Sequence, residues 1–201
     1  MGHEVVHPRV LYVGTPVYLV STENGDGTFN LAPASSHFAL GQILVLGLET
    51  DGQSAANLME RPELTVNFPS GALWEQVEKL AQVTGRNPVP AAKAERYQFE
   101  PRKFEYVGLT PQDSELVRPP RVLECDLQFE ARARRITPGM DGDYQMVEAD
   151  VLRVHAAPHL LVPGTEHIDP RRWEPLIYAF RHYFDKGAER GWRSDSSTAH
   201  L

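Results

Sequence analysis

The feature that most constrains the fold of this chain is a long alternation of apolar and polar residues. From Leu123 to Arg134, Leu, Cys, Leu, Phe, Ala and Ala alternate with Glu, Asp, Gln, Glu, Arg and Arg. Because successive side chains of a strand point to opposite faces, this predicts a long strand with one buried face. TPGMDGD at 137–143 predicts a turn into a partner strand over 144–155, with a bulge where the alternation changes phase at Val151-Leu152. Meandering hairpins of this kind indicate a barrel or a sandwich.

Five segments upstream also read as strands. They lie at 10–13, 16–22, 28–34, 42–49 and 64–68. The Asn-Gly and Asp-Gly pairs within residues 23–27 accept positive φ and predict a tight hairpin between the second and the third segment. We therefore predict a mainly β fold, a β-barrel with α-helical additions.

Two segments have helical periodicity instead. Apolar residues fall on one face of 72–84, which predicts an amphipathic helix. A second helix is predicted at about 170–186, where Asp169 is placed to cap and Pro170 occupies the first helical position. The apolar stripe of this second helix would consist of Trp173, Leu176, Ile177, Phe180 and Phe184.

The length of 201 residues favours a single domain, which we expect to cover residues 1–191. A Pro-rich stretch at 86–120 is too long for an ordinary connection, and its aromatic residues favour a packed excursion that walls a pocket. The tail at 192–201 has no periodicity and is expected to be disordered.

Charge and cysteine content exclude several classes of protein. A net charge of −7 argues against nucleic-acid binding, which needs a basic surface. The single Cys125 cannot form an intramolecular disulfide and falls on the buried side of its strand, where we expect an inert small hydrophobe. With no secretory signal and no apolar run near about eighteen residues, we expect a cytoplasmic protein that does not enter a membrane.

Two short polar motifs predict a ligand site. TFNLAPASSHF at 28–38 combines small polar residues with Ala and Pro at a strand end, which suits a flat ring that approaches the backbone closely. Ser54-Ala55-Ala56-Asn57 is placed to open a helix, where free N–H groups and the helix dipole favour a phosphate. Taken alone, each motif also fits a plain hairpin edge or a helix cap.

With these residues in this order, the chain resembles the flavin reductase-like family with the FMN-binding split barrel. The resemblance spans about 16–184 and rests on PVYLVST, on GDGTFNLAPASS where the family shows Asn-x-x-Pro-x-Ser, on QSAAN where it shows Thr-x-x-Asn, and on LTVNF. It implies a six-stranded antiparallel split barrel of the FMN-binding type, and a homodimer with FMN at the subunit interface.

The resemblance also implies the cofactor-binding residues. They are Asn30, Leu31 and Ala32 beside the isoalloxazine ring, Ser35 and Ser36 at its polar edge, and Ser54, Ala55 and Asn57 at the phosphate and ribityl chain. Asn67 matches an Asn of the family that shapes the site. Many relatives carry a basic residue at the Thr-x-x-Asn turn, which this chain lacks. Another cation should help to bind the phosphate, for which Arg61, Lys103 and Arg181 are candidates, and FMN is either tightly bound or a dissociable substrate.

The resemblance predicts an FMN-dependent oxidoreductase that takes hydride from NADH or NADPH and passes electrons to a second acceptor. The flavin carries that chemistry, so we assign no catalytic acid, base or nucleophile to the protein. A partner monooxygenase fed with reduced flavin is one candidate acceptor. Two alternatives stay open: a non-enzymatic flavin or haem binding or sensing module, and a split-barrel scaffold with a degenerate pocket.

Other motifs carry less weight. His3-Glu4-Val5-Val6-His7 has the zinc-protease spacing, but Pro8 and the Val-Val pair disfavour the helix that this site needs, so no metal is expected. His37 and the cluster Arg181-His182-Tyr183 are the remaining polar groups of interest.

Overall fold

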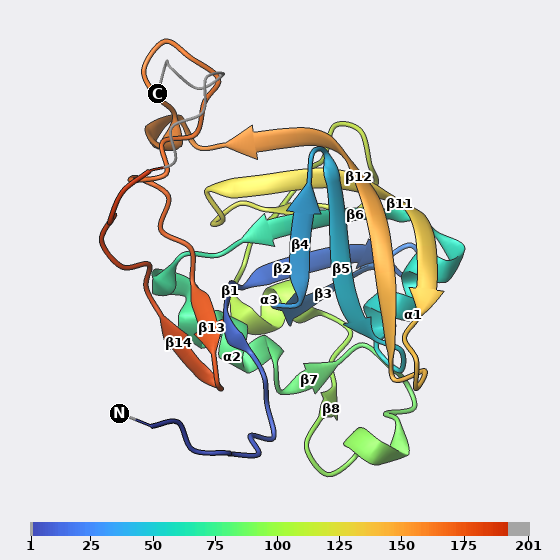
Figure 1. Cartoon of the computed structure of the whole chain (residues 1–201). Coiled ribbons are helices and arrows are strands. Elements are labelled where there is room, and N and C mark those ends of the chain that lie inside the picture. The colour runs from blue at the N-terminus through green and yellow to red at the C-terminus, as the bar shows by residue number, and fades with distance from the viewer. Residues whose placement is uncertain (1, 193–201) are drawn as a thin grey trace.

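The computed structural model describes residues 2–192. Its centre is an antiparallel sheet of seven strands in the order β3-β2-β6-β11-β12-β5-β4 (Figure 1). These strands are β2 (Tyr18–Glu23), β3 (Phe29–Ala34), β4 (His37–Leu40), β5 (Ile43–Glu49), β6 (Glu63–Phe68), β11 (Leu127–Pro138) and β12 (Tyr144–Ala156). The mainly β barrel that the sequence predicts is confirmed, with one strand more in the sheet than the six expected.

The sheet curls because its two edge strands are consecutive in the sequence. Only Ser35 and Ser36 separate the end of β3 from the start of β4. The backbone N–H of Gly47 on β5 donates to the Ser36 carbonyl at 2.8 Å, and the Tyr18 hydroxyl on β2 donates to the same oxygen at 3.4 Å. The two edges therefore meet at this link. The inner face encloses a core that includes Val20, Leu46, Leu64, Val66, Ala131 and Val147.

The long hairpin β11–β12 has the predicted bulge. Glu130 pairs with Arg153 and Ala131 pairs with Val151, so Leu152 is the extra residue. Upstream, four of the five predicted segments appear as β2, β3, β5 and β6. The fifth is displaced to β1 (Val13–Pro16), and β4 has no counterpart among the predictions.

The helix predicted at about 170–186 is wrong. This segment forms the hairpin β13 (Ile177–Ala179) and β14 (His182–Phe184), which pairs with β1. The backbone N–H of Leu176 donates to the Pro69 carbonyl, and the Leu176 carbonyl accepts the N–H of Val17. Partners elsewhere in the chain thus satisfy backbone groups that a helix would have used, and tertiary contacts override the local periodicity.

The residues of the predicted apolar stripe do not share one face and lie in different environments. Trp173 packs against the barrel core, Leu176 belongs to a second core, and Phe180 and Phe184 stay about half exposed. The predicted tail at 192–201 lies, apart from Trp192, outside the described residues.

The helices are short and lie outside the barrel. They are α1 (Gln53–Glu60), α2 (Trp74–Leu80) and α3 (Lys103–Val107), with 3₁₀ turns η1 (Gly71–Leu73), η2 (Ala91–Lys93) and η3 (Pro158–Leu160). The helix predicted at 72–84 is η1 followed by α2; it stops early because β7 (Val83–Thr84) pairs in parallel with β8 (Gln98–Phe99). No helix of the described chain is long and apolar enough to cross a membrane.

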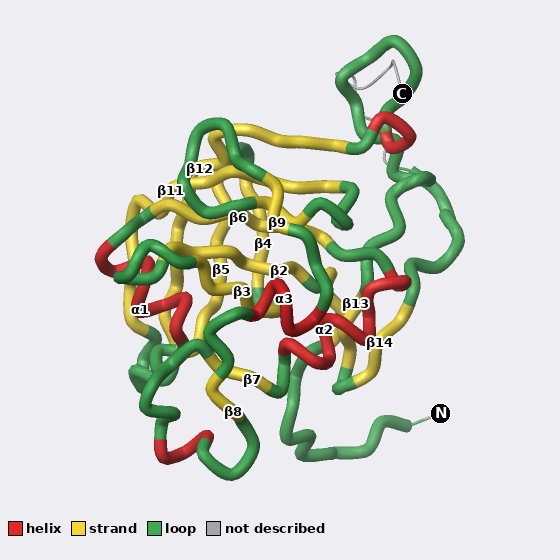
Figure 2. The backbone as a smooth tube through the Cα atoms, turned by 180° about the vertical axis from the view of Figure 1, so that it is seen from behind, coloured by secondary structure: helices red, strands yellow, loops and turns green. Residues whose placement is uncertain are grey.

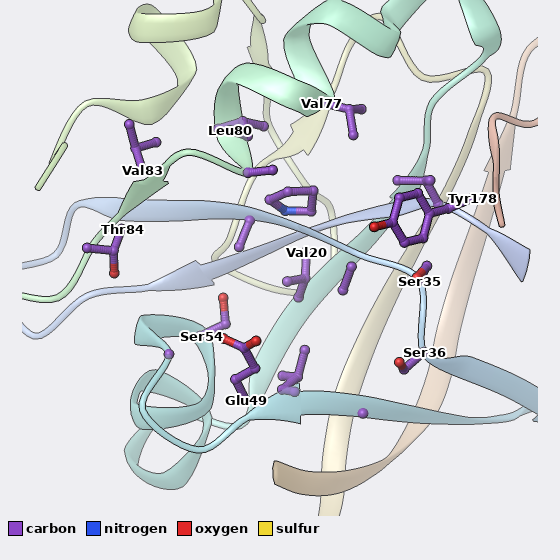
Figure 3. A pocket seen from close by; sticks show the side chains of 18 of the residues that line it. Val20, Ser35, Ser36, Glu49, Ser54, Val77, Leu80, Val83, Thr84 and Tyr178 are labelled. Carbon is purple, nitrogen blue, oxygen red and sulfur yellow. The ribbon is translucent and has the colours of Figure 1, made fainter. Parts of the chain in front are cut away.

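A second core joins the outer face of β2 and β3 to α2 and α3, which lie on the side of the barrel seen in Figure 2. Its buried members are Val17, Leu19, Leu31, Val77, Leu80, Val107, Leu109, Val122, Cys125 and Leu176. Cys125 is buried as predicted, and this burial raises the pKa of its thiol. Between these helices and the barrel rim lies a cavity (Figure 3).

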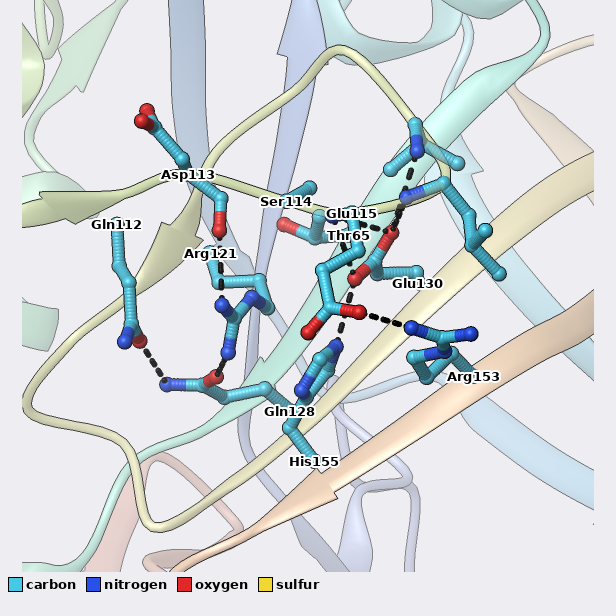
Figure 4. A network of polar contacts seen from close by, with 12 residues as sticks. Thr65, Gln112, Asp113, Ser114, Glu115, Arg121, Gln128, Glu130, Arg153 and His155 are labelled. Carbon is cyan, nitrogen blue, oxygen red and sulfur yellow. Dashed lines mark hydrogen bonds and ion pairs between the residues drawn. The ribbon is translucent and has the colours of Figure 1, made fainter.

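The predicted excursion at 86–120 contains η2, β8, α3 and β9 (Pro111–Gln112), and β9 pairs with β10 (Arg121–Val122). Its last part covers Glu130, which the alternation places on the solvent side but which is fully buried. The Glu130 carboxylate accepts the backbone N–H groups of Glu115, Leu116 and Val117 and lies 2.6 Å from His155 Nε2 (Figure 4). One buried carboxylate thus anchors the excursion to the barrel.

Hydrogen bonding decides the charge state of this carboxylate. Burial alone would raise the pKa of Glu130, but the backbone donors and His155 stabilise the anion and leave its pKa below the usual value. A carboxylate whose pKa is lowered by folding contributes stability above its unfolded-state pKa. That contribution is lost as the pH falls through the folded-state pKa.

Replacing Glu130 with Gln is expected to lower the free energy of unfolding by about 2 kcal/mol at neutral pH, because an amide cannot accept all of these donors. Urea unfolding followed by tryptophan fluorescence measures the change. The matched control is Glu148→Gln, which removes an exposed pair with Arg135 and should change stability by less than about 0.5 kcal/mol. The difference in the free energy of unfolding between wild type and Glu130→Gln should shrink below about pH 4. A constant difference would contradict the role given to the ionised carboxylate.

Candidate functional site

A cavity of about 440 Å³ opens where the β3–β4 link, the end of β5, the start of α1 and the helix α2 come together. This volume lies within the range of small-molecule sites, roughly 300–1,000 Å³. Figure 3 shows Ser54 and Glu49 near one end of the cavity and Tyr178 beside Ser35 near the other. The site is therefore elongated, with chemically different ends.

The two sequence motifs meet in this cavity. Six of the predicted cofactor-binding residues line it: Asn30, Ala32, Ser35, Ser36, Ser54 and Ala55. Asn30 and Ser54 are both buried, and Asn30 Nδ2 donates to Ser54 Oγ at 3.0 Å. The strand motif and the helix motif are thus joined by a direct hydrogen bond between side chains that are 24 positions apart.

Leu31 and Asn57 do not line the cavity. The Leu31 side chain lies on the opposite face of β3, in the second core. Asn57 Nδ2 donates to Thr22 Oγ1 at 3.0 Å and to Asn24 Oδ1 at 2.9 Å, and Asn57 Oδ1 accepts from Gln53 at 2.7 Å. Asn57 therefore ties α1 to the β2–β3 hairpin, which supports the rim from behind.

Asn67 also acts at a distance from the cavity. Its Nδ2 donates to the Leu19 carbonyl, and its Oδ1 accepts the N–H of Val122, both at about 3 Å. It thereby connects β6 to β2 and to the end of the excursion. This placement agrees with the shaping role that the resemblance implies.

One buried acceptor of the site has no donor. Asn30 Oδ1 is fully buried and forms no hydrogen bond within the part of the chain that the structure describes. A Cβ built at Gly85 would lie only 2.5 Å from this oxygen, so glycine is needed there. Buried polar atoms are nearly always paired, so this acceptor, which lies against Gly85, is an exception next to the cavity that Asn30 lines.

Three cations and one carboxylate line the cavity. Lys93 forms ion pairs with Glu49, a lining residue, and with Asp51. Burial by itself lowers the pKa of Lys93, but the two carboxylates outweigh it and raise the pKa above the usual value. The excess of positive charge contrasts with the net charge of −7 of the whole chain and favours an anionic ligand.

Lys103 is the second cation and one of the three that the sequence proposed. It is 3% exposed, and no hydrogen bond or ion pair joins its ammonium group to another described residue. Burial, opposed by the charge of Glu100 and assisted by that of Lys93, lowers the pKa of Lys103 to about 8. An unpaired buried ammonium group beside a paired one is a strong site for an anion.

The other two proposed cations have different positions. Arg181 lines the cavity. Arg61 does not; its Nε donates to the Glu23 carbonyl at 3.0 Å and its Nη1 pairs with Glu60. Sequence reasoning missed Lys93 and Gly85, because both lie in or next to the irregular excursion, where no periodicity indicates which residues face inward.

Aromatic rings form the wall near Arg181. Tyr12 and Tyr178 have ring centroids 5.5 Å apart, and those of Tyr178 and Tyr183 are 5.4 Å apart. All three line the cavity, while the Tyr183 hydroxyl donates to Glu78 at 2.9 Å. Between this aromatic wall and the lysines, the surface consists of aliphatic side chains from Val20, Leu48, Val77, Leu80 and Val83.

The remaining polar groups named from sequence lie outside the site. His37 is not among the lining residues; its ring packs between those of Tyr18 and Phe68, and burial lowers its pKa. Residues 3–7 carry no helix, so His3 and His7 do not share a helical face. The cavity thus offers an apolar middle, an end with lysines and hydroxyl groups, and an aromatic end.

Comparison with known proteins agrees with this geometry. The model of the flavin reductase like domain family matches residues 10–187. The uncharacterized protein YdfE of Bacillus subtilis (strain 168) is 37% identical over 195 residues, which cover 96% of this chain and 94% of that protein.

Solved structures share the fold. Flavoredoxin of Desulfovibrio vulgaris (Miyazaki F) superposes with a TM-score of 0.77 at 20% identity, over 99% of both chains. A split-barrel protein of the flavin reductase type from Shewanella frigidimarina NCIMB 400 gives a TM-score of 0.72 at 18% identity, over 90% of this chain and 87% of that chain. The chain therefore belongs to the flavin reductase like domain family and has its split-barrel fold.

Proposed function

We propose that this protein is an FMN-dependent oxidoreductase that takes hydride from NADH or NADPH and passes electrons to a second acceptor. The observation that carries the proposal is the cavity in which Asn30 and Ser54 meet, with serine hydroxyl groups and the unpaired, buried Lys103 in its wall. These features fit a ligand that combines a hydrogen-bond donor, a flat ring and an anion. FMN has all three.

The lining residues divide naturally between the parts of FMN. Ser54 Oγ at the start of α1, with Lys93 and Lys103, would hold the phosphate, since hydroxyl and ammonium groups are good phosphate donors. Asn30 Nδ2 donates to Ser54 Oγ, which leaves the hydrogen of the Ser54 hydroxyl group to be donated to the bound group. The link at Ser35 and Ser36 and the aliphatic wall would confine the ring.

When bound, FMN supplies the redox chemistry, which no side chain of the cavity can supply. The protein then contributes binding, orientation and the exclusion of water. The cavity needs no triad or pair of catalytic carboxylates for such a reaction. A pyridine nucleotide would have to enter the same cavity, whose wall includes Tyr12, Tyr178 and the β3–β4 link.

We further propose that two copies of the chain complete the site. Phe38 and Leu40, immediately after the cavity link, are 55% and 73% exposed on the edge strand β4. Apolar residues that stay this exposed next to a ligand site favour burial against a partner. A second copy is the partner that the resemblance implies.

The purified protein is expected to bind FMN and to oxidise NADH or NADPH in its presence. Absorbance in the flavin bands and FMN fluorescence quenching measure binding, and the loss of absorbance at the nicotinamide band measures turnover. No binding would refute the proposed cofactor. Binding without turnover of either nucleotide would refute the proposed reaction and favour a storage or sensing role.

Ser54→Asp is expected to abolish FMN retention, because it places a carboxylate where the phosphate would bind. The matched control is Ser54→Thr, which keeps the hydroxyl group and should retain FMN. Flavin absorbance after gel filtration, with light scattering to determine the oligomeric mass, distinguishes loss of the ligand from loss of assembly. Normal FMN retention by Ser54→Asp would contradict the assignment of the phosphate end.

Lys103→Met should weaken FMN binding at least about tenfold at pH 7, the typical effect of losing a hydrogen bond to a charged group. Lys103 is protonated below its pKa of about 8, and a bound anion would raise that pKa. Wild-type affinity should therefore decline as the pH rises above 8, whereas the variant should respond less, since the phosphate charge is already constant there. Lys79→Met on the exposed side of α2 is the control. If FMN affinity depended on pH in the same way in wild type and Lys103→Met, the role given to Lys103 would be contradicted.

A further inference from the structure

Arg181 is a cation at the end of the cavity away from Lys93 and Lys103. Lys93 is tied to Glu49, which lies near Ser54 at one end of the view in Figure 3. Arg181 lies at the other end, near Tyr178, where its guanidinium charge opposes the effect of burial on the pKa of that tyrosine. The site therefore presents positive charge at both ends.

The backbone holds Arg181 in this place at some cost. Phe180 and Arg181 form the two-residue turn between β13 and β14, with φ of 45° and 70°. Residues other than glycine rarely adopt this left-handed region, and turns of this shape usually contain Asn-Gly. The Phe180 N–H donates to the Tyr12 carbonyl at 2.8 Å, which fixes the turn against the segment before β1. Glycine would suit position 181 better, yet an arginine occupies it.

The Arg181 guanidinium has no partner among the described residues. It forms no hydrogen bond and no ion pair within residues 2–192, and the carboxylate among the lining residues, Glu49, is paired with Lys93. By contrast, Arg171 and Arg172 on the same C-terminal segment pair with Glu189 and Asp169. Arg181 is thus free to bind an anion that enters the cavity.

The surroundings of Arg181 also favour a flat ring. Tyr12 is 42% exposed, and Tyr178 packs against both Tyr12 and Tyr183. Tyrosine rings provide large, rigid faces for stacking, and a guanidinium group binds carboxylate or phosphate through two parallel hydrogen bonds. A mononucleotide has a single phosphate, which Ser54 and the lysines would engage, so Arg181 is left for another molecule.

We propose that Arg181, with Tyr12 and Tyr178, forms a subsite for the second substrate and selects one that carries an anionic group beside an aromatic ring. This inference rests on the proposed function, since it concerns what the same site reduces or oxidises. The anion can belong to an aromatic carboxylate that accepts electrons or to the 2′-phosphate of an adenine nucleotide donor. Both offer the same chemistry to Arg181.

The test measures binding by isothermal titration calorimetry to the full chain, with and without added FMN. Two probe pairs differ in charge: benzoate against benzamide, and adenosine 2′-phosphate against adenosine. Arg181→Gly removes the guanidinium and suits the positive φ, so its thermal midpoint should equal or exceed that of wild type. Arg171→Gln, which removes an exposed arginine outside the cavity, is the control.

The charged member of at least one pair should bind wild type and the control about tenfold better than the neutral member, and Arg181→Gly should lose this preference. A preference for benzoate identifies an acceptor, and a preference for adenosine 2′-phosphate identifies a nucleotide donor. Equal binding of charged and neutral probes, or a preference that survives in Arg181→Gly, would overturn the inference.

A fall in FMN affinity in Arg181→Gly would likewise overturn it, because Arg181 would then serve the flavin. Failure of the proposed function has a different signature, namely no FMN binding by wild type. In that case the titrations are made in the Lys103→Met background, where a preference for the charged probe that is lost on adding Arg181→Gly supports the subsite and one that survives overturns it.

Discussion

The structure depends on the two-residue link between β3 and β4. These strands are the two edges of the sheet, and Ser35 and Ser36 leave no length of chain to span an open sheet. The sheet must therefore curl until its edges meet. Two hydrogen bonds hold this closure, because the Gly47 N–H and the Tyr18 hydroxyl both donate to the Ser36 carbonyl oxygen. The same closure places the link at the rim, where it forms a wall of the cavity.

Polar groups buried around this rim keep its parts in register. Asn57 joins α1 to the β2–β3 hairpin, Asn67 joins three strands, and Glu130 anchors the excursion that brings Lys93 and Lys103 to the cavity. Each of these groups is satisfied by its own partners. Asn30 Oδ1 and the Lys103 ammonium are not, and buried groups without partners are costly. Because Lys103 lines the cavity, a ligand that enters it can offset the cost of the unpaired ammonium group.

Much of the barrel could be predicted from local pattern. The alternation in β11, the phase change at Leu152 and the Asn-Gly and Asp-Gly turn each act over a few residues, so periodicity and turn chemistry determine them. The segment at 170–186 has helical spacing as well, yet Leu176 bonds to Pro69 and Val17 and the segment becomes a hairpin. The alternation likewise predicts an exposed Glu130, because the segment that buries it is distant in the sequence.

The sequence by itself determined β2, β3, β5, β6, β11 and β12, the β2–β3 hairpin, and the residues Asn30, Ser35, Ser36 and Ser54, because these follow from short motifs. Only the tertiary structure decided which cations face the cavity, since Lys93, Lys103 and Arg181 come from irregular or mispredicted segments. It also decided that Leu31 and Asn57 support the rim rather than line it. The physical reason is that a side chain's neighbours depend on how distant segments pack, which periodicity along one segment does not encode.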